Sequence, residues 1–134
     1  MDKIKRIRIL LILAALVIIT GCIIAFNYLK DVKTYQETVK SMTFTEIDLS
    51  KIPDGIYEGE CDVNYIYAKV KVTIKDSKIH QIQLIEHKNQ RGTSAVGIID
   101  AILEEQKIDV NTISGATNSS KVIKKAVENA LKVK

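Results

Sequence analysis

Residues 65–74 read YIYAKVKVTI, and along this stretch apolar side chains alternate with more polar ones. The apolar series is Ile66, Ala68, Val70, Val72 and Ile74. Successive side chains of a β-strand point to opposite faces of its sheet, so this alternation indicates one buried face. The stretch therefore predicts a β-strand with one face in a core and the other face, with its tyrosines and lysines, toward water.

The segments on either side of this strand extend it into a sheet. Residues 55–63, GIYEGECDV, also alternate and stand just before it. Residues 75–78, KDSK, have the composition of a turn, and residues 79–87, IHQIQLIEH, return as an antiparallel partner. Residues 55–87 thus predict a three-stranded antiparallel meander.

Two helices are predicted after the sheet. Residues 95–106, AVGIIDAILEEQ, and residues 121–131, KVIKKAVENAL, repeat apolar side chains every three or four positions. That spacing puts the apolar side chains on one stripe of a helix, which needs a surface to cover. We predict an α+β domain in which two helices pack on one face of the antiparallel sheet.

A long apolar segment precedes the domain. Residues 9–26 contain no charged side chain, and these 18 residues are near the lower limit for crossing a hydrocarbon core roughly 30 Å thick. Four of the first eight residues are basic and one is acidic, a bias that keeps the N-terminus in the cytoplasm. We predict a single-pass anchor over residues 1–29 in the cell membrane, with the C-terminal domain on the extracytoplasmic face.

Two alternatives to a membrane helix remain open at this segment. A cleaved signal peptide is disfavoured because no small-x-small site follows the apolar run cleanly. Residues 19–22, ITGC, resemble a bacterial lipoprotein box, in which Cys22 would be lipidated. Against this, residues 23–26 continue the apolar run beyond Cys22. A lipid anchor and a membrane helix would tether the same domain to the same face.

The remainder of the chain divides into a linker and the domain. Residues 28–42 keep a helical spacing of apolar side chains, which predicts a stalk helix that continues from the membrane. The next residues, TFTEIDLSKIPDG, break that period and end in turn formers. We predict a stalk or linker over residues 30–46 and the domain over residues 47–134.

Charge and cysteine content exclude two classes of protein. The formal net charge is +4, and most of it comes from the N-terminal cluster, so the domain lacks the basic face of a nucleic-acid-binding protein. Cys22 and Cys61 lie far apart and there is no CxxC pair or Cys/His cluster, which argues against a structural zinc site.

Small and hydroxylic side chains crowd residues 111–120, NTISGATNSS, directly before the last predicted helix. Thr117, Asn118 or Ser119 would be an ordinary N-cap, and Gly115 would allow a turn with positive φ. The alternative is a site for an anion at the free N–H groups of the helix. The spacing is neither that of a P-loop nor that of a GxGxxG fingerprint.

The same segment resembles a known motif. SGATNSS followed by an amphipathic helix resembles the flavinylation motif of FMN-binding domains, which occur in sodium-pumping and Rnf-type redox complexes and in small membrane-tethered bacterial proteins. The resemblance covers roughly residues 54–132. It includes the opening DGIYEGE, the hairpin VKVTIKDSKIHQIQLIEHK, an RG dipeptide after the last strand and a helix that ends in Gln.

The resemblance implies a covalent cofactor. In that family a separate flavin transferase uses FAD to join FMN to the second hydroxyl residue of the motif through a phosphoester bond, which places the FMN on Thr117. The residues implied to shape the loop are Ser114, Gly115 and Ala116. Those implied to lie beside the phosphate are Asn118, Ser119 and Ser120.

Two further positions bear on the cofactor. The family often has a basic pair after a strand, which here is His87 and Lys88, and these side chains would contact the flavin or its phosphate unless they are only a solvated strand end. The family usually has Asp six residues before the modified Thr, but this chain has Asn111 there, and the nearest acid is Asp109. The departure puts efficient flavinylation in doubt.

The implied function is electron transfer. A flavin on a tethered domain would pass electrons between partners, among them a membrane dehydrogenase or a quinone-linked redox partner, as a component of a redox system and not as a stand-alone enzyme. The sequence has no nicotinamide-binding fingerprint. The alternatives are non-covalent FMN binding, or a flavin-free tethered module that binds a partner, which Asn111 favours.

Overall fold

The computed structural model describes residues 2–88 and 93–132. The chain forms two compact units, Met1–Thr34 and Tyr35–Lys134. The first helix, α1 (Lys3–Lys40), begins in the first unit and ends in the second. Each unit is described by itself below.

The first unit consists of the apolar part of α1. By length and composition α1 is able to cross a membrane, in agreement with the predicted anchor. Its large apolar side chains are exposed, among them Leu10, Val17 and Ile24 at 64%, 71% and 70%. Cys22 is also exposed on this helix, and the lipid-anchor alternative at this residue stays open.

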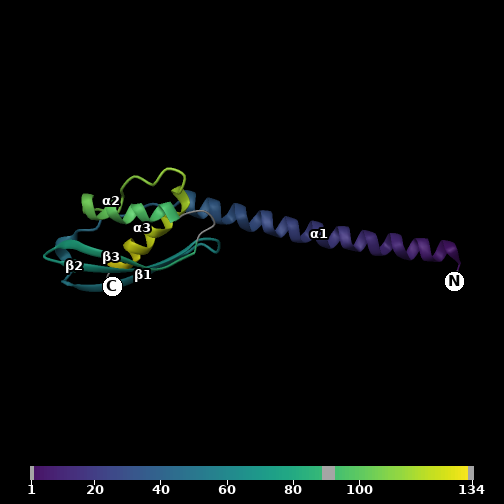
Figure 1. Cartoon of the computed structure of the whole chain (residues 1–134), viewed down its shortest axis with the longest axis horizontal. Coiled ribbons are helices and arrows are strands. Elements are labelled where there is room, and N and C mark those ends of the chain that lie inside the picture. The colour runs from purple at the N-terminus through teal and green to yellow at the C-terminus, as the bar shows by residue number, and fades with distance from the viewer. Residues whose placement is uncertain (1, 89–92, 133–134) are drawn as a thin grey trace. The chain divides into compact units, whose positions relative to one another are not determined.

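The sheet of the second unit is the predicted meander. Its strands are β1 (Gly55–Asp62), β2 (Tyr67–Lys75) and β3 (Lys78–Lys88), antiparallel in the order β1-β2-β3 (Figure 1). On β2 the predicted apolar series Ala68, Val70, Val72 and Ile74 is buried, while the intervening residues are partly exposed. The alternation of the sequence therefore identified the buried face correctly.

The turn between β2 and β3 explains their register. Asp76 and Ser77 have φ values of 51° and 62°, the two positive values that a type I′ hairpin turn requires. Asp54 accepts a hydrogen bond from the Asp76 backbone N–H at 2.9 Å, which holds the turn to the start of β1. The resulting register pairs Ile74 with Ile79 and Val72 with Ile82, so the two apolar series meet.

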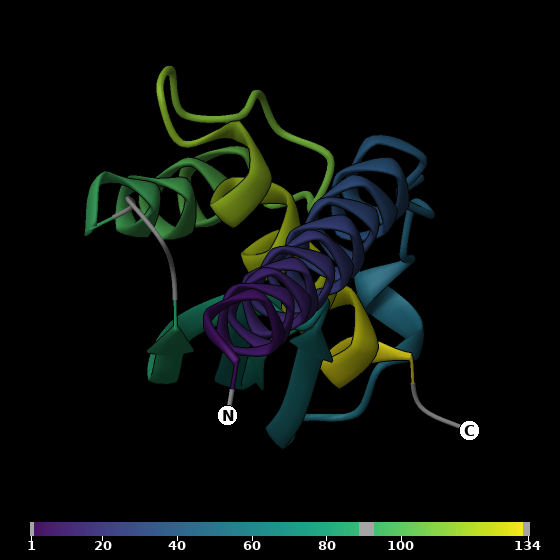
Figure 2. The same cartoon turned by 90° about the vertical axis from the view of Figure 1, so that its right-hand side faces the viewer.

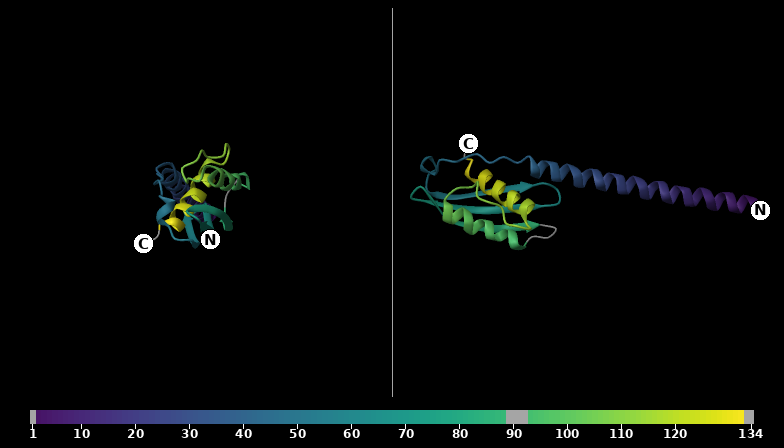
Figure 3. Two further views of the ribbon diagram at one scale, coloured as in Figure 1. Left: turned by 90° about the vertical axis from the view of Figure 1, so that its left-hand side faces the viewer. Right: turned by 90° about the horizontal axis from the view of Figure 1, so that it is seen from above.

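Two helices cover the buried face of the sheet (Figure 3). A short 3-10 segment over Thr93–Val96 leads into α2 (Gly97–Glu105), which packs on β3. The longer helix α3 (Thr117–Leu131) packs on β1 and β2. This arrangement confirms the predicted α+β fold with two helices on one face.

The helix α3 approaches β1 very closely at Gly59. A Cβ atom at this position would lie 2.3 Å from both the Ala126 carbonyl oxygen and the Ala130 nitrogen. Only glycine fits there, because a side chain would collide with the backbone of α3. Asn129 adds a hydrogen bond of 2.8 Å from its side chain to the Glu60 carbonyl.

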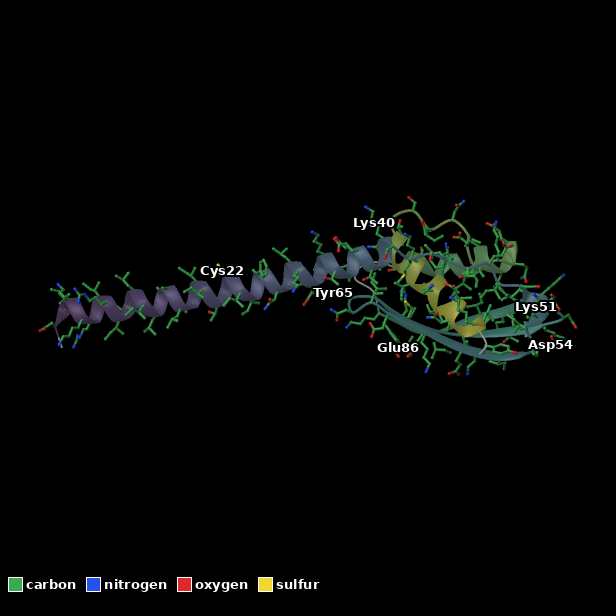
Figure 4. The ribbon with its side chains drawn as sticks, turned by 180° about the vertical axis from the view of Figure 1, so that it is seen from behind. Cys22, Lys40, Lys51, Asp54, Tyr65 and Glu86 are labelled. Carbon is green, nitrogen blue, oxygen red and sulfur yellow. The ribbon has the colours of Figure 1, made fainter. Side chains whose placement is uncertain are left out.

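The end of α1 belongs to the second unit, although the sequence analysis assigned residues 30–46 to a stalk. Val39 is fully buried, and the rings of Tyr35 and Tyr65 lie 5.0 Å apart. The helical period of the stalk thus serves contacts within this unit. Lys40 and Tyr65 lie at one end of the unit, and Lys51 lies at the opposite end (Figure 4).

Residues 43–45 continue along α3 and are held by its charged side chains. Glu128 is fully buried and accepts a hydrogen bond of 3.3 Å from the Thr45 N–H. Lys125 donates to the Thr43 carbonyl at 3.1 Å and to Glu128 at 2.8 Å. Lys132 pairs at 2.6 Å with the same Glu128 oxygen that accepts the Thr45 N–H. The sequence analysis missed the contacts of Thr43 and Thr45 with α3, because these partners lie about eighty residues apart along the chain.

Candidate functional site

The loop that joins α2 to α3 ends in a tight turn at the SGAT motif (Figure 2). Gly115 has φ of +80°, and the Ala116 N–H donates to the Ile113 carbonyl at 3.0 Å. This is the geometry of a type II turn with glycine at its third position. A Cβ atom on Gly115 would meet nothing within 4 Å, so the outer side of the turn is open.

The helix α3 begins at Thr117 without a side-chain cap. The N-cap position is Ala116, whose φ is −135°, and no side-chain cap hydrogen bond is present at this described helix start. Thr117, Asn118 and Ser119 therefore occupy the first helical turn, and the interpretation that one of them is the N-cap is wrong. The backbone N–H groups of this turn have no acceptor within the helix.

The hydroxyl side chains of the motif divide between the surface and the interior. Ser114 and Thr117 are exposed, and Asn118 is half-buried. Ser119 is buried, and Ser120 is fully buried with its Oγ accepting the Ile113 N–H at 3.2 Å. Thr117 is thus available for modification, whereas Ser120 points inward and supports the loop.

The basic pair predicted near the cofactor lies at the end of β3. His87 pairs with Ala68 of β2 and is half-buried, and burial lowers the pKa of its imidazole. Lys88 pairs with Tyr67 and is exposed. β3 packs on α2, whereas the motif opens α3. The contact of His87 and Lys88 with a flavin or its phosphate stays a prediction. The RG dipeptide at 91–92 lies outside the described residues.

The acid nearest to the motif in the sequence is held elsewhere. Asp109 accepts a hydrogen bond of 2.9 Å from Lys124, which also donates to the Val110 carbonyl at 2.8 Å and is itself buried. Lys124 lies seven residues after Thr117, which is about 10 Å along the helix axis. Asp109 therefore does not supply the carboxylate that Asn111 lacks.

Lys121 connects the first turns of α3 to the end of α1. Its ammonium group lies 3.3 Å from the Val39 carbonyl and 3.4 Å from the Lys40 carbonyl, two of the last acceptors of α1. A cation is favoured at a helix C-terminus, where the carbonyl groups have no intrahelical partner. Lys121 lies one helical turn after Thr117. The sequence analysis missed its contact with the end of α1.

The other reactive side chains have structural surroundings. Burial raises the pKa of the Cys61 thiol to about 11, so this residue is protonated at neutral pH and is a poor nucleophile. The hydroxyl of Tyr57 donates to the Pro53 carbonyl at 2.7 Å, and that of Tyr67 donates to Glu60 at 2.8 Å. Among the described residues no cluster of His, Cys, Asp or Glu is arranged to hold a metal ion.

Comparison with known proteins identifies the region that contains this loop. Residues 67–132 match the FMN-binding domain family. The match runs from β2 through α3 and includes the whole SGATNSS motif, which confirms the resemblance seen in the sequence. Residues 67–132, just under half of the chain, thus match an FMN-binding domain, and α1 is long and apolar enough to cross a membrane.

A relative is known in Treponema pallidum (strain Nichols), where it is named an uncharacterized protein. It is 28% identical over 85 residues, which cover 61% of this chain and 24% of the relative. The chain therefore spans about a quarter of the length of that relative.

The geometry of the motif fits the phosphate of FMN. Thr117 presents an exposed hydroxyl at the first position of a 15-residue helix that has no side-chain cap. The positive end of the helix dipole and the free N–H groups of the first turn favour an anionic phosphate there. The open side of Gly115 leaves room for a bulky group to approach the backbone.

Proposed function

We propose that this protein is a membrane-tethered electron carrier whose FMN is joined to Thr117 by a phosphoester bond. The observation that carries the proposal is the position of Thr117, exposed at the uncapped start of α3 within the family match. Each of the two exposed hydroxyls, Ser114 and Thr117, is accessible, but only Thr117 is the second hydroxyl of the motif.

The attachment reaction balances as a transfer from FAD by a flavin transferase. The Thr117 Oγ forms a bond to the phosphorus of the FMN half, and the pyrophosphate bond of FAD breaks. AMP leaves with the bridging oxygen, and the hydroxyl proton passes to a base of the transferase. The chain gains the mass of FMN minus water.

Once attached, the group would be held by the residues around the turn. The N–H groups of the first turn of α3 bind the phosphate, and Gly115 allows it to lie against the backbone. FMN, when bound, supplies the redox chemistry, and the protein holds it in place. His87 and Lys88 are the residues proposed to contact the flavin or its phosphate from the end of β3.

The tether supports a role at the membrane. The apolar part of α1 and the basic N-terminus favour a domain on the extracytoplasmic face, where a flavin that dissociates is lost. A covalent bond prevents that loss. The proposed partners are the flavin transferase and a membrane dehydrogenase or quinone-linked redox protein.

The test is the intact mass of the full chain after co-expression with a flavin transferase. We expect a gain of one FMN minus water in the wild type and in Thr112→Ala, a control in the same loop, and no gain in Thr117→Ala. An unmodified wild type, in cells that modify a reference FMN-binding domain, would reject covalent attachment.

One observation favours a second candidate function. Asn111 stands where the family usually has Asp, and Asp109 is paired with Lys124, so this chain lacks a carboxylate at the expected place. A domain of this kind would bind FMN without a covalent bond, or would bind a partner without flavin. Equilibrium dialysis of free FMN against the unmodified chain separates these two possibilities.

A further inference from the structure

Ser120 closes a ring of hydrogen bonds around the start of α3. Its Oγ accepts the Ile113 N–H at 3.2 Å, and its own backbone N–H donates to the Ala116 carbonyl at 2.9 Å. The third bond runs from the Ala116 N–H to the Ile113 carbonyl at 3.0 Å. The ring thus contains the turn, the first helical hydrogen bond and one side chain.

The ring determines how Thr117 is presented. Thr117 lies between Ala116 and Ser120 on the closed path, so its backbone direction depends on both. Ser120 is fully buried, and its hydroxyl has a fixed place among the packed side chains of α3. The Ile113 N–H would lose this acceptor if the hydroxyl were removed, and the turn would then be free to move.

The ring is also connected to α2. A Cβ atom on Gly97 would lie 3.6 Å from the Ile113 Cδ1, so the Ile113 side chain packs beside the first residue of α2. Ser120 therefore joins the loop to the starts of both helices. Its hydroxyl faces the interior, whereas Thr117 is exposed, so Ser120 does not need to contact the cofactor to act.

We propose that Ser120 is a positioning residue for the transfer of FMN to Thr117. It holds the Ile113 N–H so that the turn presents the Thr117 hydroxyl to the flavin donor in one orientation. The inference rests on the proposed function. A small displacement of a reacting group lowers the rate of the chemical step far more than it lowers binding.

The experiment compares Ser120→Ala with Thr112→Ala in the full chain. Thr112 is half-buried next to Ile113 in the same loop, and its side chain makes no hydrogen bond within the described residues, so its loss removes a hydroxyl without opening the ring. A third variant, Ser120→Thr, keeps the hydroxyl. The readouts are hydrogen exchange at the Ile113 amide and the kcat and KM of FMN transfer by a flavin transferase from FAD.

We expect Ser120→Ala to speed exchange at Ile113 and to lower kcat by about tenfold or more with KM nearly unchanged. We expect Thr112→Ala to match the wild type, and Ser120→Thr to recover most of the rate. The folded fraction of each variant is measured by circular dichroism at the assay temperature, so that rates are compared per folded molecule.

Three results would overturn the inference, and they differ in whether they also reject the proposed function. If the wild type is modified and folded Ser120→Ala is modified at the same kcat, Ser120 has no positioning role but the proposed function stands. An equal loss in Thr112→Ala would attribute the effect to a general disturbance of the loop and not to the Ser120 hydrogen bond. If the wild type is never modified, the proposed function and the positioning role both fall.

Discussion

Asn111 is the residue at which this chain differs from the usual pattern of the FMN-binding domains that it resembles. It is exposed in the middle of the loop between α2 and α3, six residues before Thr117. An amide keeps some of the hydrogen bonds of a carboxylate but accepts no proton, so it cannot act as a base. The neighbouring carboxylate of Asp109 is paired with Lys124 about 10 Å along the helix from Thr117, and it offers no substitute.

Restoring the carboxylate should therefore speed attachment. We expect Asn111→Asp to raise the rate of FMN transfer to Thr117 by roughly 100-fold, the lower end of a typical general-base contribution. The measurement is the fraction of modified chain against time by intact mass. Asn111→Ser, which changes the side chain without adding a charge, serves as the control. Equal rates for Asn111→Asp and the wild type would show that the position takes no part in the transfer.

At the scale of elements, the regular structure was predictable because its patterns are local. The period-2 alternation on β2 and the helical spacing on α3 depend only on neighbouring residues, and both elements formed as expected. The contacts of Thr45 with Glu128 and of Lys121 with Val39 join segments about eighty residues apart. No local pattern contains that information.

The candidate site was predictable in part. The motif located Thr117 and the turn at Gly115, and the structure places both at the start of α3. The inward direction of Ser120 was missed. It follows from helical spacing, because Ser120 lies on the same face as Ile123 and Val127, both of which are fully buried. The helical spacing was therefore enough to predict that Ser120 is buried, although the sequence analysis considered the hydroxyl residues only as caps or ligands.

The helix α3 carries a carboxylate whose protonation should control stability in acid. Burial alone would raise the pKa of Glu128, but hydrogen bonds from Lys125, Lys132 and the Thr45 N–H outweigh it and lower the pKa to about 2. A carboxylate whose pKa is lower in the folded state stabilises the fold at pH values above its unfolded pKa, which is near 4.5. That contribution, roughly 3 kcal/mol, is lost as the pH falls from about 4.5 to about 2.

We expect Glu128→Gln to lower the free energy of unfolding by roughly 2–3 kcal/mol at pH 7 and to have a much smaller effect near pH 2. Urea unfolding of both proteins across this range is the measurement. The control is Glu104→Gln, at an exposed position of α2, which should change stability by less than about 0.5 kcal/mol. A loss at Glu128 that stays constant with pH would mean that its charge is not the stabilising feature.

At the scale of the whole molecule, the question is where the folded domain begins. The sequence predicts a start at residue 47, whereas the second compact unit begins at Tyr35. Tyr35 and Val39 are 9% and 0% exposed. Phe44 lies 4.1 Å from the ammonium group of Lys124, measured to the ring centroid. Residues 35–46 thus contribute apolar burial, a cation–π contact and backbone partners for α3.

A fragment of residues 47–134 should therefore be much less stable than a fragment of residues 35–134. Removing residues 35–46 exposes the apolar surface that Val39 covers and takes the Thr45 N–H from the buried carboxylate of Glu128. We expect a loss of roughly 4 kcal/mol in the free energy of unfolding, the sum of one buried aliphatic side chain and a damaged charge network.

Urea unfolding followed by circular dichroism measures this loss, with residues 30–134 as the control that adds only part of the first unit. If the shorter fragment unfolds at the same urea concentration, the domain begins at residue 47 and the end of α1 serves only as a tether. If it is destabilised as expected, the end of the tether helix is part of the fold on which the presentation of Thr117 depends.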